Sequence, residues 1–498
     1  MGPTAPPIDG QTWLDHDPIR PAQMYGRVVV LVFWAASCEA SLRCLQQVQE
    51  IVANSGRARG VEPTDPDVMA VAVHSPRMPV DDDVERLRHT VARHRITVPV
   101  VHDPRFQTWS RYNPPGWPSI AVIDGNGKST GIVAGCRNIG IVEDAIQVAL
   151  DAPKKRRRRD DARDRLDLTS HGSIDLPDPP GDTSVDKSTL RYPEGLSVVD
   201  DGGVGPLIAV ADGGHDRVLI GRFDQVERRI VVETLITGLD QPAGLTFLDE
   251  GQHVAVVERG GNVVSTFDVV TGDRTIVATG LERPTGITVD RDGSLVICDG
   301  GGDRLYRAVA NSTRSGYLVY PVAGSGRTGT KPGDAAAADL AQPSAVVRSN
   351  AGLLFSDAAS NNLRLLTDDG QVVNITDCEL FDWGLVDGLA HRARLQRPGD
   401  LCVLDDGSII FADEGNNRLR RFHQRRITTL GLSGLNSPSA VATLDSRHLL
   451  VADANNHRLI TVDTAGQTAW PVTLELFSHS HRTEAESYVS SGKTVDAT

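Results

Sequence analysis

The chain has 498 residues, a formal net charge of −14, 40% hydrophobic residues and 23% charged residues. This composition excludes a wholly disordered chain and predicts two to four domains. The negative charge disfavours nucleic acid as a partner, and no apolar run reaches the ~18 residues that a membrane helix needs. Residues 1–10 have no basic start and no apolar stretch, so we expect no secretion signal. Six cysteines are too few for a disulfide scaffold, which favours a cytoplasmic protein.

Residues 11–150 alternate strand-like and helix-like segments. Apolar runs of strand length lie at 28–34, 68–73 and 98–102, and residues 119–124 and 129–134 flank a Gly-Asn-Gly turn typical of a hairpin. Helical spacing or an acidic first turn predicts helices from residue 39 to about 55, from residue 81, and over 139–150. This order predicts a mixed α/β sheet with helices on its faces.

Residues 151–185 differ in composition from both neighbouring regions. Lys154–Arg159 is a block of six positive charges, and Leu176–Pro180 is rich in proline. Blocks of like charge and clusters of proline resist packing, so we predict a linker between two domains.

Residues 186–472 contain six copies of one pattern, each with a proline, an apolar strand, a turn, a second strand that ends in an acid, a polar turn and a third strand. The prolines are Pro193, Pro242, Pro284, Pro343, Pro398 and Pro438. The strand-ending acids are Asp212, Glu258, Asp299, Asp357, Asp413 and Asp453, and the polar turn residues four positions later are Asp216, Asn262, Asp303, Asn361, Asn417 and His457. Repeats of about 40 residues with several short strands predict a six-bladed β-propeller. The polar residues 473–498 are expected to form a flexible tail.

The repeat pattern resembles the NHL repeat, and the first domain resembles thioredoxin-like folds. The second resemblance depends on Phe33–Cys38 (FWAASC) after a strand and on Gly116–Ser119 (GWPS) before the hairpin. Together the two halves resemble the family of NHL repeat-containing protein 2. That family implies a thioredoxin-like domain fused to a six-bladed NHL propeller, over roughly residues 11–472.

The resemblance implies a candidate redox site formed by Cys38, Ser41, Trp117 and Pro118. Cys38 is predicted to lie at the start of a helix, where the dipole stabilises a thiolate, and the fold implies that Pro118 faces it. The family commonly has a second cysteine where this chain has Ser41, and serine cannot resolve a disulfide. The site is therefore either a one-cysteine redox site or a degenerate one, and we favour the degenerate one.

Cys44 and Cys136 are the two other cysteines near this site in sequence that could resolve a disulfide. Cys44 lies six residues after Cys38, which is about 240° around a helix, and it has the spacing of a buried residue. Cys136 follows the hairpin and could approach the site only if the Cα atoms come within about 7 Å. We expect Cys44 to be structural and Cys136 not to take part.

The repeated acids of the second half could bind metal or form turns. Aspartate with Asn or Asp four residues on typically hydrogen-bonds backbone groups, so we favour a structural role and predict no metal and no cofactor. Arg217, Arg304, Arg418 and Arg458 directly follow four of the polar turn residues and are expected to pair with the acids. Residues 186–472 hold 27 Lys and Arg against 37 Asp and Glu, which weighs against RNA.

The leading hypothesis is an intracellular interaction or scaffold protein whose propeller binds a protein partner or a small ligand. One alternative is a thiol-disulfide oxidoreductase or redox sensor that acts through Cys38. Another is a metal-dependent propeller hydrolase or lyase. The sequence leaves enzymatic activity open.

Overall fold

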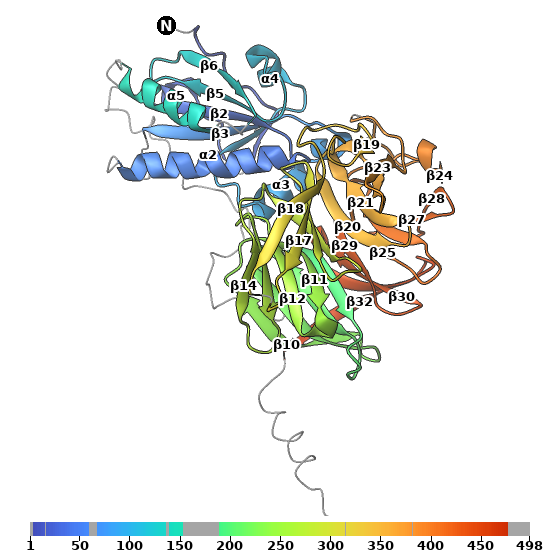
Figure 1. The fold of residues 1–498 in the computed structure, drawn as a ribbon. Coiled ribbons are helices and arrows are strands. Elements are labelled where there is room, and N and C mark those ends of the chain that lie inside the picture. Colours follow the sequence, from blue (N-terminus) through green and yellow to red (C-terminus); the bar gives the residue numbers. More distant parts are fainter. Residues whose placement is uncertain are drawn as a thin grey trace, which may run out of the picture.

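The computed structural model describes residues 3–14, 16–58, 67–135, 139–152, 189–313, 315–380 and 382–476. The predicted linker beyond residue 152, Cys136 and residues 477–498 lie outside this part of the chain. Figure 1 shows two bodies, an α/β domain from the first part of the chain and a β-rich body from the second. None of the described helices has the length and apolar character needed to cross a membrane.

The first body is a six-stranded sheet with the order β1-β4-β3-β2-β5-β6. Strands β2, β3 and β4 run parallel, whereas β5 is antiparallel to β2, and β6 to β5. The strands are β1 (Thr12–Leu14), β2 (Val28–Trp34), β3 (Val68–His74), β4 (Val100–His102), β5 (Ser119–Ile123) and β6 (Ser129–Ala134). The helices are α1 (Pro21–Met24), α2 (Glu39–Ala58), η1 (Pro79–Asp82), α3 (Val84–Arg93), α4 (Gln107–Tyr112) and α5 (Ile139–Asp151).

Strands β2 and β3 are the two middle strands of this sheet, and all seven residues of each are buried. Strand β2 leads directly into the predicted redox motif. Its alternate side chains enter two cores, one shared with α2, α3 and α5 and the other with α4. The predicted helix at residue 81 is divided: η1 comes first, and the Asp83 side chain then caps α3. In Figure 1, α2 and α3 lie on the side of the sheet that faces the second body. The predicted α/β domain with covered sheet faces is thus observed.

The second body consists of five sheets, two of four strands, two of five and one of eight. The four-stranded sheets are β11 (Pro242–Leu248), β12 (His253–Glu258), β13 (Val263–Asp268), β14 (Arg274–Ala278), and β15 (Pro284–Val289), β16 (Leu295–Asp299), β17 (Arg304–Ala310), β18 (Tyr317–Ala323). The five-stranded sheets are β19 (Gly333–Asp334), β20 (Pro343–Ser349), β21 (Gly352–Asp357), β22 (Asn362–Leu366), β23 (Gln371–Asn374), and β24 (Gly388–Leu389), β25 (Pro398–Val403), β26 (Ile409–Asp413), β27 (Arg418–His423), β28 (Arg426–Thr429).

The eight-stranded sheet joins the first repeat to the last. It contains β7 (Pro193–Val199), β8 (Leu207–Asp212), β9 (Arg217–Asp224), β10 (Arg229–Thr237), β29 (Pro438–Thr443), β30 (His448–Asp453), β31 (Arg458–Asp463) and β32 (Ala469–Leu476). Within it, β10 pairs in parallel with β32. Strand β32 therefore extends to residue 476, which corrects the predicted start of the flexible tail at residue 473. Thr473 belongs to the sheet, because it pairs with Arg229 of β10.

Each proline-opened strand is the first strand of a repeat and contacts the corresponding strand of the next repeat. The contacts run in the order β7, β11, β15, β20, β25 and β29, and β29 contacts β7 again. Short 3-10 turns follow the second strand in several repeats: η3 (Gly213–His215), η5 (Ala358–Ser360), η7 (Glu414–Asn416) and η8 (Ala454–Asn456). Two further 3-10 turns are η4 (Asp249–Gly251) and η6 (Ala390–Arg392). The prediction of propeller-like β-sheets after an α/β domain is confirmed.

Candidate functional site at the junction of the two domains

The residue before each repeat proline has a left-handed backbone conformation in all six repeats. These pre-proline residues, called the pre-proline ring below, are Tyr192, Gln241, Arg283, Gln342, Arg397 and Ser437. Each of their backbone N–H groups donates a hydrogen bond to the polar turn residue of the preceding repeat. The last repeat supplies this bond to the first, because Tyr192 N–H donates to His457 Nδ1 at 3.1 Å. The polar turn residues thus connect neighbouring repeats.

The strand-ending acids have a different structural role, within their own repeat. Each accepts a hydrogen bond from the backbone N–H two residues before the proline, as Asp212 does from Arg191 at 2.7 Å. The preferred structural interpretation of these acids is therefore confirmed. Among the described residues, no group of three His, Cys, Asp or Glu side chains could hold a metal ion.

The predicted pairing of four arginines with these acids is half correct. Arg217 and Arg458 each donate to the acid of their own repeat at 2.8 Å. Arg304 and Arg418 donate to backbone carbonyls instead. In two repeats the acid pairs with an arginine seven residues later: Arg364 with Asp357 and Arg420 with Asp413. An arginine five or seven residues after the acid can reach it, because these two positions are alternate residues of one strand and share one face of the sheet.

Most of the pre-proline ring contacts the α/β domain. Arg283 Nε lies 2.8 Å from Glu39 Oε2, and both side chains are buried. Arg397 donates to the carbonyl oxygen of Ser37 at 2.7 Å, and the Ser437 hydroxyl lies 3.3 Å from the Arg86 guanidinium. Tyr192 OH lies 3.2 Å from His89 Nδ1. The α/β domain therefore packs against this ring.

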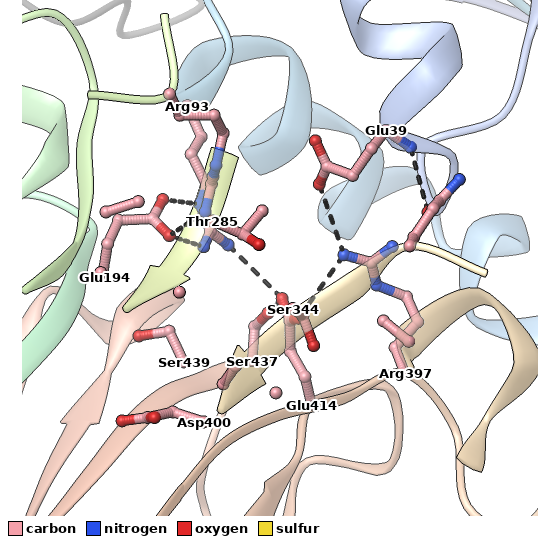
Figure 2. A pocket seen from close by; sticks show the side chains of 18 of the residues that line it. Glu39, Arg93, Glu194, Thr285, Ser344, Arg397, Asp400, Glu414, Ser437 and Ser439 are labelled. Carbon is pink, nitrogen blue, oxygen red and sulfur yellow. Dashed lines mark hydrogen bonds and ion pairs between the residues drawn. The ribbon is translucent and has the colours of Figure 1, made fainter. Parts of the chain in front are cut away.

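A buried network of charges spans the junction. Arg93 of α3 pairs with Glu194 through two hydrogen bonds and lies 3.5 Å from Glu414. Arg397 lies 3.7 Å from Glu414 and 3.9 Å from Glu39, which completes a chain of alternating charge (Figure 2). We call Glu39, Arg93, Glu194, Arg397 and Glu414 the charge network. Removal of one member of such a pair is costly, because the charge of the other member then stays buried without compensation.

The network fixes the protonation state of its carboxyl groups. Burial raises the pKa of Glu39, but the guanidinium of Arg283 and further positive charges outweigh burial and hold the pKa well below its usual range. Burial likewise opposes ionisation of Glu414, but Arg397, Arg93 and Arg86 lower its pKa to about 2. Both groups are therefore carboxylates at neutral pH.

Cys38 lies directly before α2, as predicted, but the propeller covers it. Its side chain is only 3% exposed. The Gln342 side chain bridges the helix start, since its Nε2 donates to Cys38 Sγ at 3.7 Å and its Oε1 accepts from Glu39 N–H at 3.2 Å. In this arrangement a protein disulfide substrate has no path to the sulfur.

The other residues of the predicted redox site are Ser41, Trp117 and Pro118. Ser41 is buried, and its hydroxyl lies 3.4 Å from the backbone N–H of Ala35. The Trp117–Pro118 peptide bond is cis, and Trp117 Nε1 donates to the Ser75 carbonyl at 2.9 Å. A catalytic role for Cys38, Ser41, Trp117 and Pro118 stays a prediction. Cys44 is fully buried in the core, in agreement with its predicted structural role.

A cavity of about 120 Å³ lies between the two domains. The charge network borders it, together with Arg86, Arg259 and residues from the first strands of the propeller repeats. On the propeller side it is lined by Thr285, Ser344, Asp400 and Ser439, which we call the cavity floor (Figure 2). Asp400 is half-buried and pairs with no arginine or lysine of the described residues, and desolvation raises its pKa to about 7. The cavity thus combines paired charges on one side with a single carboxyl group on the other.

Comparisons with known proteins agree with this architecture. The NHL repeat model matches residues 395–422 and 435–460. NHL repeat-containing protein 2 of Bos taurus is 24% identical over 543 residues, which cover 92% of this chain and 70% of that protein. The chain is a relative of NHL repeat-containing protein 2. The recognition made from the repeats and the FWAASC motif is confirmed.

Two further similarities extend the comparison. Protein SUPPRESSOR OF QUENCHING 1, chloroplastic, of Arabidopsis thaliana is 22% identical over 525 residues, which cover 93% of this chain and 47% of that protein. The chain therefore spans about half the length of that relative. A solved thioredoxin-like protein in its oxidized form is 23% identical, with a TM-score of 0.27, and the match covers 30% of this chain and 95% of that structure.

The pre-proline ring was missed by sequence reasoning, although a signal for it exists. The prolines and the polar turns were recognised as repeated positions, whereas the residue before each proline varies between Tyr, Gln, Arg and Ser. A variable polar position next to an invariant one within a repeat indicates a surface used for contacts. Asp400 could have been found in the same way, because the corresponding residues of the other repeats are Gly195, Gly244, Gly286, Ala345 and Ala440.

Proposed function

We propose that the chain is a two-domain binding protein, in which the thioredoxin-like domain is held over the channel mouth of a six-bladed NHL propeller. The cavity between the domains carries this proposal. Polar groups that converge on a cavity at a domain boundary are typical of a small-molecule site. A protein partner on the propeller accords with the common role of NHL propellers in protein interaction.

The blade count of six is part of the proposal. It treats the eight-stranded sheet as two blades whose outer strands, β10 and β32, have joined. Support comes from the six bonds that connect the polar turns to the pre-proline ring, the last of which runs from Tyr192 to His457. Six repeats that contact one another in cyclic order leave almost no unpaired sheet edge.

The domain limits and the location are also proposals. We propose a thioredoxin-like domain at 11–150, a linker at 151–185, a propeller that starts near 186, and a tail that begins after residue 476 instead of at 473. A cytoplasmic location accords with the scarcity of cysteines, of which the five in the described residues are free thiols.

The two enzymatic alternatives find less support. An oxidoreductase that uses Cys38 needs the domains to separate first, because Cys38 is buried and the Gln342 side chain from the propeller contacts its sulfur. A metal-dependent hydrolase needs converging ligands, but the repeated acids are occupied by backbone N–H groups. We therefore rank binding above both.

Thiol labelling of the full chain tests the docked arrangement. Cys38 of the wild type should react with an aromatic disulfide reagent at least 100-fold more slowly than a thiol in the unfolded chain. Arg283→Glu places a carboxylate against Glu39 and should raise the labelling rate at least tenfold. Arg291→Glu is the matched control, since Arg291 is an exposed arginine of the same repeat. Rapid labelling of wild-type Cys38, followed by mixed-disulfide exchange with a protein client, would establish the oxidoreductase alternative instead.

A further inference from the structure

The floor of the interdomain cavity presents hydrogen-bond acceptors and no free donor among its hydroxyl groups. Thr285 Oγ1 donates to the carbonyl oxygen of Pro343 at 2.9 Å. Ser344 Oγ donates to the carbonyl oxygen of Pro398 at 2.9 Å. Each hydroxyl hydrogen is thus directed into the propeller wall, while oxygen lone pairs are left for the cavity.

Ser439 follows the same rule, and Asp400 adds a carboxyl group. Ser439 Oγ donates to the carbonyl oxygen of Pro193 at 2.7 Å. Asp400 Oδ2 accepts from Val441 N–H at 3.1 Å, and no guanidinium or ammonium of the described residues pairs with this carboxyl group. Figure 2 shows Asp400 apart from the dashed lines of the charge network. The floor is therefore complementary to a group that only donates hydrogen bonds.

The charges around the cavity lead to the same conclusion. The cavity is lined by Arg86, Arg93, Arg259 and Arg397 and by the carboxylates of Glu39, Asp81, Glu194 and Glu414, and Glu39 also pairs with Arg283 behind the lining. His94 also lines the cavity, and burial holds its pKa well below the usual value, so it adds no charge at neutral pH. Asp400 lies apart from these charges, because no guanidinium of the described residues pairs with it, and an ionised carboxyl group in a cavity is costly without a counter-charge.

We propose that the cavity floor binds the primary ammonium group of a small aliphatic amine, with Asp400 as its counter-charge and the Thr285, Ser344 and Ser439 oxygens as further acceptors. This inference rests on the proposed binding function and specifies its ligand class. An ammonium group has three donors and no acceptor, which matches the floor. Leu245, Ile287 and Val346 also line the cavity and suit the aliphatic part. A divalent metal is disfavoured, because it takes several oxygen ligands and the floor has one carboxylate.

Calorimetric titration of the full-length protein with n-butylammonium chloride at pH 8 tests the proposal. An alkylamine is protonated at this pH, as the lysine side chain is. We expect saturable binding, and at least tenfold weaker binding of n-butanol, which has no charge, and of tetramethylammonium, which has no N–H. Sodium or potassium that competes as well as butylammonium at equal concentration would overturn the proposal in favour of a simple ion site.

Variants separate the floor from the rest of the cavity. Asp400→Asn keeps an oxygen for Val441 N–H and should weaken butylammonium binding at least tenfold, whereas the exposed Asp405→Asn in the same repeat should leave it unchanged. If Asp400→Asn does not fold, Ser439→Ala should still weaken binding at least threefold. Unchanged binding in the folded variants overturns the ammonium site. Absence of binding while Cys38 is still protected from labelling refutes the ligand class alone, whereas rapid Cys38 labelling refutes the docked arrangement.

Discussion

Glu39 Oε2 lies 2.8 Å from Arg283 Nε, and the two buried side chains belong to different domains. One is the first residue of α2, and the other is the pre-proline residue of the third repeat. Glu39 lies next to Cys38, so the ion pair that joins the domains is adjacent to the sulfur of the predicted redox site. The start of α2 therefore lies in the contact between the two domains.

Glu39→Gln tests the contribution of this pair. The change leaves the Arg283 charge buried without its partner, and removal of one member of a buried ion pair typically costs about 3–5 kcal/mol. Urea unfolding should therefore show a large loss of stability together with faster Cys38 labelling. The exposed Glu85→Gln serves as the control and should change neither. A loss below about 1 kcal/mol would contradict the structural role of the pair.

Gln342→Ala tests the cover over Cys38. The variant loses the amide that donates to Cys38 Sγ and accepts from Glu39 N–H, so the labelling rate of Cys38 should rise about fivefold to tenfold, the equivalent of about 1–1.4 kcal/mol. Gln241→Ala is a matched control, because Gln241 is the same residue type in the same ring and makes no hydrogen bond to the described part of the α/β domain. Equal labelling rates in the two variants would show that Gln342 does not protect the sulfur.

His457→Ala tests the bond that closes the circle of repeats. The variant loses the acceptor of Tyr192 N–H and should be destabilised by about 1–3 kcal/mol. His457→Asn keeps an acceptor and suits the left-handed backbone at this position, where φ is 54°. Asparagine should therefore match or exceed the wild-type melting temperature. If both variants melt together, the hydrogen bond contributes little.

Asp299 should make stability depend on pH, because it is buried without an arginine partner. Burial raises the pKa of this carboxyl to about 7, above the unfolded value near 4. A raised pKa favours folding at low pH, and that advantage is lost as the pH rises through 7. The loss begins near pH 4, where the unfolded carboxyl ionises. Asp299→Asn, which keeps an acceptor for Glu282 N–H, should therefore gain stability relative to the wild type between pH 5 and pH 8, by about 1–4 kcal/mol.

The opposite result is expected for an acid that has an arginine partner. Asp453 pairs with Arg458 at 2.8 Å, so Asp453→Asn should be less stable than the wild type at pH 8. Chemical denaturation at both pH values measures the two variants side by side. Equal behaviour of Asp299→Asn and Asp453→Asn would show that the arginine partner does not determine what the acid contributes to stability.

Much of the architecture could be predicted because its signals are local. The apolar run of β2, the helical spacing of α2 and the repeated proline-to-acid pattern each depend on residues close in sequence. The acidic residues from 81 onward predicted the start of a single helix. In the structure η1 ends at Asp82, and α3 begins at Val84 after the Asp83 side chain, which caps it. The parallel pairing of β10 with β32 joins residues 229 and 473, and no local pattern indicates a pairing over that distance.

The candidate site was predicted in part for the same reason. The position of Cys38 before α2 follows from the local motif, but its burial depends on Gln342, which is 304 residues away in sequence. The arginines illustrate the limit within a repeat. Arg217 could be matched to Asp212, whereas Asp413 pairs with Arg420 instead of the expected Arg418. Asp357 pairs with Arg364, in a repeat for which no arginine was predicted. The contact between the domains determines whether Cys38 is exposed to solvent, and the spacing of residues within the motif carries no information about that contact.

The β10–β32 pairing has a consequence for synthesis on the ribosome. The outer edge of the first repeat is completed only by Thr473–Leu476, and Tyr192 obtains its acceptor only from His457. Nascent chains that have emerged only as far as residue 450 carry an unfinished edge, which is a template for pairing with other chains. The last 25 or so residues of the repeat region thus close a sheet edge that stays open in every shorter nascent chain.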